Sequence, residues 1–172
     1  MKLSKELAKQ AKAKGICSPW HAELLTLESK EEMVAMYIKG IDFCLANDYP
    51  KNDFIRKHFK GVMEKQGVFL DDDISIDVMD KNTKCVCLGT TKAVVNIYEY
   101  GVCEVFAKHN SCLAVNAEGN AFVVIDIFDD AVVHICANDK AKVCVNRYGG
   151  IVKYEANGDA IVKIREKNKK TY

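Results

Sequence analysis

AFVVIDIFDD AVVHICANDK AKVCVNRYGG IVKYEANGDA IVKIRE, residues 121–166, repeats one pattern about every ten residues. Each unit opens on a small residue, has Val, Leu or Cys at its third position and Val, Ile or Tyr at its fifth. The pattern extends back to about residue 73, and the small first residues are Ala93, Gly101, Ser111, Ala121, Ala131, Ala141, Gly150 and Ala160. A short fixed period of this kind is typical of stacked repeat architectures.

The repeat predicts a β-solenoid, built from half-coils of about ten residues. Positions one, three and five are small or apolar in the same phase each time, which points one face of every strand inward. A weaker period of about twenty residues, seen in Phe128 and Tyr148, indicates two strands per coil and four or five coils. The alternative is an antiparallel β-sandwich or barrel, because short strands at 8–12 residue spacing also fit those folds.

The residues before the repeat predict helices. Ser29 and Glu32 fit a capping box that opens the longest helix, to about Ala46, and a last helix follows over Asn52–Lys65. We therefore expect an α+β protein with a helical cap domain over residues 1–67. A β-solenoid repeat domain with a short basic C-terminal tail follows over residues 68–172. We expect the cap to pack on the first coil.

Bulk composition narrows the function classes. The 172 residues are 49% hydrophobic with a formal net charge of +1, so no global field favours nucleic acid or an anionic membrane. No apolar run approaches the roughly 18 residues that a membrane helix needs. The N-terminus lacks the apolar core of a signal peptide. We expect a cytoplasmic chain without a membrane partner.

Several Cys, His and Asp residues could carry chemistry, but none forms a complete constellation. A tetrahedral metal site needs four ligands, and a cysteine nucleophile needs an adjacent base with an orienting group. The groups considered are Cys85 with Cys87, His109 with Cys112, His134 with Cys136, and the trio Asp126, Asp129 and Asp130. We interpret the eight cysteines as reduced, space-filling core residues. The sequence predicts no catalytic residue, no metal, no cofactor and no enzyme.

A partner-binding surface is the alternative to chemistry. Arg147 and Tyr148 precede two glycines, and this combination fits either a recognition loop or a strand-to-strand turn. Specificity would lie at outward strand positions and along the basic C-terminal segment. The candidate partner-binding residues are Arg147, Tyr148, His134, Lys153, Lys163 and Arg165.

Two stretches carry a resemblance. Residues 40–50, GIDFCLANDYP, with Phe54-Ile55-Arg56 after them, and residues 143–150, VCVNRYGG, resemble uncharacterised small proteins of prophages and mobile elements from gut anaerobic bacteria. The resemblance covers most of the chain and implies no activity. It implies a context in which short proteins bind a host or defence protein.

These observations predict a non-enzymatic protein that presents a rigid solenoid surface to a protein partner, such as a host defence protein that it inhibits. One alternative is self-assembly into a dimer or filament through the solenoid end. A further alternative is nucleic-acid binding through the basic tail, which would be salt-sensitive.

Overall fold

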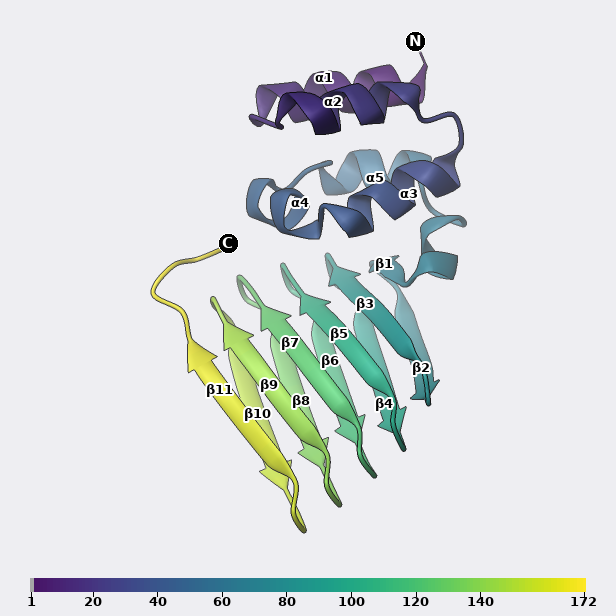
Figure 1. Ribbon diagram of the computed structural model, residues 1–172. Helices are drawn as coiled ribbons and strands as arrows, with labels where there is room; N and C mark the ends of the chain where they lie inside the picture. Colours follow the sequence, from purple (N-terminus) through teal and green to yellow (C-terminus); the bar gives the residue numbers. More distant parts are fainter. Residues whose placement is uncertain (1) are drawn as a thin grey trace. The chain divides into compact units, whose positions relative to one another are not determined.

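The computed structural model describes residues 2–172, which divide into two compact units. The helical unit comprises the residues up to Gln66 together with Thr171 and Tyr172, and the solenoid unit comprises Gly67–Lys170. Figure 1 shows helices in the first unit and long paired strands in the second. The predicted α+β class is confirmed.

The helical unit contains short helices. They are α1 (Leu3–Ala13), α2 (Ser18–Thr26), α3 (Lys30–Lys39), α4 (Ile41–Asn47), α5 (Asn52–His58) and the 3-10 helix η1 (Met63–Gln66). The predicted capping box begins α3, where Ser29 Oγ accepts the Glu32 N–H at 3.1 Å and the Glu32 carboxylate accepts the Ser29 N–H at 2.9 Å. The backbone bond from Ser29 lowers the pKa of Glu32. No helix in residues 2–172 is long and apolar enough to cross a bilayer.

Two predicted helices are shorter than expected. The helix predicted over residues 29–46 is divided at Gly40 into α3 and α4. A Cβ at Gly40 would lie 2.8 Å from the Trp20 ring, so this close approach requires glycine. The helix predicted over Asn52–Lys65 stops at the end of α5. Gly61, with φ +86°, lies in the connection between α5 and η1, a left-handed conformation that L side chains avoid.

The solenoid unit is built from eleven strands in residues 67–170. They are β1 (Val68–Leu70), β2 (Asp73–Met79), β3 (Asn82–Leu88), β4 (Lys92–Tyr98), β5 (Val102–Ala107), β6 (Cys112–Ala117), β7 (Phe122–Ile127), β8 (Val132–Ala137), β9 (Lys142–Arg147), β10 (Ile151–Ala156) and β11 (Ile161–Glu166). Sheet A has the order β1-β3-β5-β7-β9-β11, and sheet B has the order β10-β8-β6-β4-β2. Figure 1 shows sheet A in front of sheet B.

The parallel pairing confirms the β-solenoid. Neighbouring strands in both sheets run in parallel, as in β5 with β7 and β6 with β8. The antiparallel sandwich or barrel is therefore the wrong alternative. Equivalent residues of consecutive coils are mostly 20 apart, and Val115 pairs with Ile135 in this register. The predicted period near twenty is thus one full coil with two strands.

The core lies between the two sheets. Every second residue of the central strands points inward and is buried, as the pattern of β6 and β7 shows. Val115, Val123 and Ile125 have no exposed surface. The alternating side chains of parallel paired strands form columns along the solenoid, so each inward residue contacts its equivalents above and below.

The first predicted repeat unit is displaced by two residues. The repeat predicts Ala93 at a corner, but Ala93 pairs with Leu113 inside the strands. Thr91 occupies the corner instead, because Lys92 pairs with Cys112, the residue after Ser111. Thr91 is polar, and this obscured the column in the sequence.

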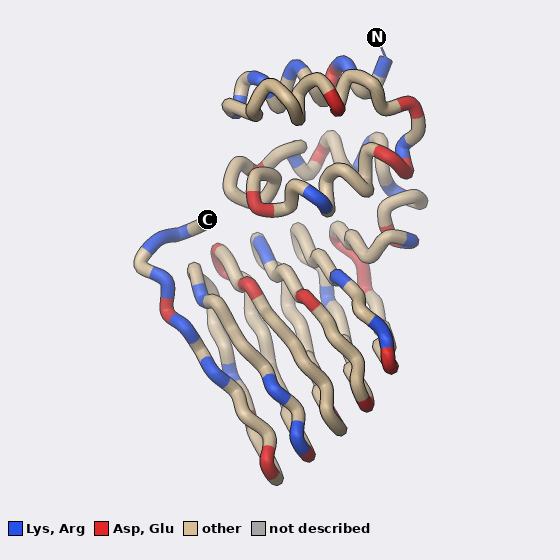
Figure 2. Tube along the Cα trace, in the orientation of Figure 1, with Lys and Arg blue, Asp and Glu red and all other residues tan. Residues whose placement is uncertain are grey.

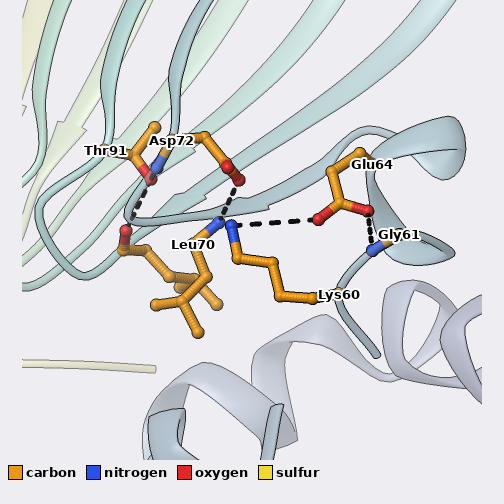
Figure 3. A network of polar contacts seen from close by, with 7 residues as sticks. Lys60, Gly61, Glu64, Leu70, Asp72 and Thr91 are labelled. Carbon is orange, nitrogen blue, oxygen red and sulfur yellow. Dashed lines mark hydrogen bonds and ion pairs between the residues drawn. The ribbon is translucent and has the colours of Figure 1, made fainter. Parts of the chain in front are cut away.

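Hydrogen bonds close the corners of the solenoid. At the first corner, Thr91 Oγ1 donates to the Leu88 carbonyl at 2.7 Å and accepts the Asp72 N–H at 3.3 Å, while an Asp72 carboxylate oxygen accepts the Leu70 N–H at 3.0 Å (Figure 3). Thr91 has no exposed surface. Without these hydrogen bonds its hydroxyl group would be buried unsatisfied. Figure 3 also shows the Glu64 carboxylate of the helical unit, which accepts the Gly61 N–H at 2.8 Å.

Turn side chains also connect one coil to the next. The Asp80 carboxylate accepts the Tyr100 N–H at 3.1 Å, and the Asp139 carboxylate accepts the Gly119 N–H at 3.0 Å. Both aspartates have positive φ, at 49° and 59°. Asp tolerates this conformation better than most residues, which explains acidic residues at tight turns.

Candidate interaction surface

The last coil of the solenoid ends both sheets. Strand β10 pairs only with β8, and β11 pairs only with β9, so each has one unpaired edge. Unpaired N–H and C=O groups along a strand edge are a template for another strand.

Inward residues of this coil are exposed, although their equivalents in earlier coils are buried. Tyr154 pairs with Ile135, yet 51% of Tyr154 is exposed against 3% of Ile135. Val152, Val162 and Ile164 are half-buried, because no further coil of residues 67–170 covers them. We call the surface formed by Val152, Tyr154, Val162 and Ile164, with the free edges of β10 and β11, the open end.

Basic residues surround the open end. Lys153 lies on β10, and Lys163 and Arg165 lie on β11, with all three side chains exposed. Residues 151–170 contain six basic and three acidic side chains. Figure 2 shows the basic positions along β11 and in the segment after it. The open end therefore combines apolar surface with a positive rim.

The predicted partner-binding residues all lie in the last two coils, but not on one face. His134 and Lys153 are exposed, paired neighbours on the outer face of sheet B. Lys163 and Arg165 lie on the outer side of sheet A, across the core from the first pair.

Arg147 and Tyr148 have partners within the chain. Arg147 Nε donates to the Gly150 carbonyl at 2.9 Å, and its Nη1 lies 3.0 Å from a Glu166 carboxylate oxygen. The Tyr148 ring stacks on Phe128 with centroids 4.8 Å apart and planes 13° apart. Burial raises the pKa of the Tyr148 hydroxyl. The geometry thus supports the strand-to-strand turn interpretation of this pair more than the recognition-loop interpretation.

Sequence reasoning missed the apolar residues of the open end. Val152, Tyr154, Val162 and Ile164 fit the same repeat as the buried residues, so the pattern assigned them to the core. The available signal was position: they belong to the last repeat, and nothing in residues 67–170 follows to cover them.

The interpretation of the cysteines as core residues is wrong for Cys17 and Cys112, which are exposed. The Sγ atoms of Cys85 and Cys87 lie 3.7 Å apart, with both residues fully buried. The hydrogen bond between these thiols, together with burial, raises the pKa of Cys85, and burial raises that of Cys103 to about 12. His109 Nδ1 accepts the Gly89 N–H at 3.0 Å. These contacts hold the neutral thiols and a turn imidazole in place.

Asp126 lies on strand β7, and Asp129 and Asp130 lie in the turn that follows it. Asp126 accepts a hydrogen bond from the Asn146 amide at 2.7 Å, and Asp129 lies 3.1 Å from Lys108 Nζ. Asp130 is exposed. Among residues 2–172, no group of three or more His, Cys, Asp or Glu side chains is arranged to hold a metal ion.

Comparisons with protein-family models, curated proteins and solved structures found no match.

Proposed function

We propose that this chain is a non-enzymatic interaction protein that presents the open end of a rigid β-solenoid to a protein partner. The observation that carries the proposal is the exposure of Tyr154. Tyr154 occupies a core position of the repeat, and its equivalent in the preceding coil, Ile135, is buried. An apolar surface with a polar rim is typical of a protein-binding site.

Strand addition fits this surface. A partner strand beside β10 or β11 would satisfy the free backbone groups of that edge, while its side chains cover Tyr154 or Ile164. Burying one such side chain contributes about 1.5–3 kcal/mol. Because the strand edges are already ordered by β8 and β9, little conformational entropy is lost on binding.

The positive rim makes the surface selective. Charged residues at an edge strand discourage indiscriminate pairing. Lys153, Lys163 and Arg165 therefore favour a partner with acidic side chains at matching positions. The resemblance to prophage and mobile-element proteins makes host proteins, including defence proteins, the first partners to test.

The test is capture of partners by the full chain with and without an intact open end. Tyr154→Lys with Ile164→Lys places charges on the apolar surface, and Val94→Lys is the matched control on the outer face of β4. We expect the wild type and the control to retain a partner, or a further copy of the chain, at fixed stoichiometry by native mass spectrometry. We expect the open-end variant to lose it.

Two results would contradict the proposal. One is a partner that the folded open-end variant binds as tightly as the wild type does. The other is a wild-type chain that binds neither another protein nor itself. Circular dichroism of each variant separates lost binding from lost folding.

A further inference from the structure

Sheet B is open at both of its ends. Strand β2 pairs only with β4, just as β10 pairs only with β8. Ile74 and Ile76 of β2 are half-buried core residues, like those of the last coil. The half-buried residues packed against the solenoid core thus come from its first and last coils: Ile74, Ile76, Val152, Ala160, Val162 and Ile164.

The two ends carry opposite charge. Residues 68–88 contain five acidic and two basic side chains, whereas residues 151–170 contain three acidic and six basic ones. Asp73 and Asp77 lie exposed on β2 itself, and Lys153 lies exposed on β10.

We infer that the partner of the open end is the β2 edge of a second copy of this chain, so that copies stack head to tail through sheet B. The inference rests on the proposed function, since it names the occupant of the same surface. Both edges are unpaired, both run in the same direction within the sheet, and their charges are complementary.

The register of the solenoid predicts the contacts. The column that ends at Val152 begins at Ile74, through Val133, Leu113 and Ala93. Continuing the same register into a second copy places its Ile74 against Val152. One half-buried core residue would then cover another.

The neighbouring columns follow the same rule. The column of Tyr154 begins at Ile76, and that of Lys153 begins at Ser75. Lys153 would thus face Ser75 of the second copy, with Asp73 and Asp77 two residues to either side. Diagonal neighbours on a sheet are within reach of a long side chain.

Sheet A contributes mainly charge to this contact. Its first strand, β1, has three residues and is fully buried, so it offers less edge than β2 does. Lys163 and Arg165 of β11 add positive charge beside the contact. A face-to-face dimer of two open ends would instead bring these basic residues against each other, which electrostatic repulsion opposes.

Head-to-tail stacking does not stop at two copies. A contact between two different surfaces of the same chain adds copies until rotation closes a ring or growth stops. The mass in solution should therefore rise with concentration above the 19.2 kDa of one chain. It should fall as salt screens the charges.

Charge exchange between the two ends tests the inference. Lys153→Glu with Lys163→Glu and Arg165→Glu makes an acidic last coil, and Asp73→Lys with Ser75→Lys gives strand β2 a net positive charge. Asp77 is left unchanged because it accepts a hydrogen bond from Asn96 at 2.9 Å. Each variant alone opposes like charges where residue 153 meets strand β2 of the next copy, and should remain monomeric, whereas an equimolar mixture should associate again.

The measurement is sedimentation velocity of the full chains over a concentration series, at about 50 mM and about 500 mM salt. Recovery of association in the mixture supports head-to-tail stacking. A wild type that stays monomeric throughout overturns it, as does a closed dimer that only the last-coil variant disrupts. If the wild type is monomeric but still captures another protein through Tyr154 and Ile164, the inference fails while the proposed function stands.

One substitution should strengthen the assembly. Glu155 lies in the column that begins at Asp77, so stacking opposes two carboxylates. Glu155→Lys should tighten association about two- to fivefold. Glu118→Lys, an exposed change in a turn between β6 and β7, is the control and should have a smaller effect. Equal effects of both changes would show that net charge, rather than this register, governs association.

Discussion

At the residue scale, the corners of the solenoid need small side chains. Ala131 and Ala141 have no exposed surface, and each lies at a turn between two strands. The next coil comes close to this corner, because the Ile151 N–H donates to the Ala131 carbonyl at 2.9 Å. A Cβ at Gly150 would lie only 2.3 Å from that same carbonyl oxygen. Little space remains for a larger residue in this column.

Enlarging a corner residue should therefore destabilise the fold. Ala131→Leu or Ala141→Leu should lower the free energy of unfolding by about 1–3 kcal/mol through overpacking. Lys142→Leu, at the exposed position beside Ala141, should change it by much less. Urea denaturation of the three variants measures the difference. If all three unfold alike, the corner assignment is wrong.

Single residues explain where sequence reasoning succeeded and where it stopped. The repeated alanines and Ser111 indicate the column of small corner residues. Thr91, at the start of this column, does not fit the pattern of small residues, and its hydroxyl group is buried only because it donates a hydrogen bond to the Leu88 carbonyl. Arg147 and Tyr148 have the composition of a binding loop. Their stacking and hydrogen bonds depend on Phe128 and Glu166, whose positions only the coil geometry supplies.

At the scale of elements, an aromatic stack connects equivalent strand-to-strand turns of successive coils. Lys108 Nζ lies 5.4 Å from the centre of the Phe128 ring, this ring stacks on Tyr148, and Lys167 Nζ lies 6.0 Å from the centre of the Tyr148 ring. Lys108 is only 5% exposed, and its ion pair with Asp129 balances its charge. The stack joins the ends of strands in consecutive coils.

Removing the centre of this stack should destabilise the turn region. Phe128 has no exposed surface, and Phe128→Ala should lower the free energy of unfolding by about 3–5 kcal/mol. Tyr100→Ala, at a residue that is 70% exposed, should stay within about 0.5 kcal/mol of the wild type. Thermal and denaturant unfolding compare the two. Equal losses would contradict a structural role for the stack.

The helices show a limit of local sequence patterns. The capping box at Ser29 is a local signal and predicted the start of α3 correctly. The division at Gly40 depends on the Trp20 ring, which lies twenty residues earlier in the chain. Apolar spacing continues across Gly40, so no local pattern marks the break.

At the scale of the whole solenoid unit, each coil is stabilised by its neighbours. Strands β6 and β7 each pair with a neighbouring strand on both sides, whereas β10 and β11 each pair with one strand only. The repeat predicted this fold because every coil obeys the same pattern. The open end could not be predicted from the pattern, since Tyr154 and Ile164 obey it as well, and their exposure depends on what lies beyond the last coil.

Repeat proteins with nearest-neighbour contacts should lose order from their ends. We expect amide hydrogen exchange to be fastest in β10 and β11 and slowest in β6 and β7, because end coils open without breaking the contacts of the centre. Hydrogen exchange with mass spectrometry at low protein concentration measures this gradient. Uniform protection across the strands would contradict independent opening of the last coil.

The same measurement at high concentration connects the fold to its assembly. If copies stack head to tail, protection should rise together in β2 and β10, the two strands that the contact pairs, while β6 and β7 stay unchanged. A rise in β10 and β11 without β2 would instead indicate a partner at the open end that is not the first coil of another copy. Whether β2 gains protection together with β10 therefore shows which surface the last coil recognises.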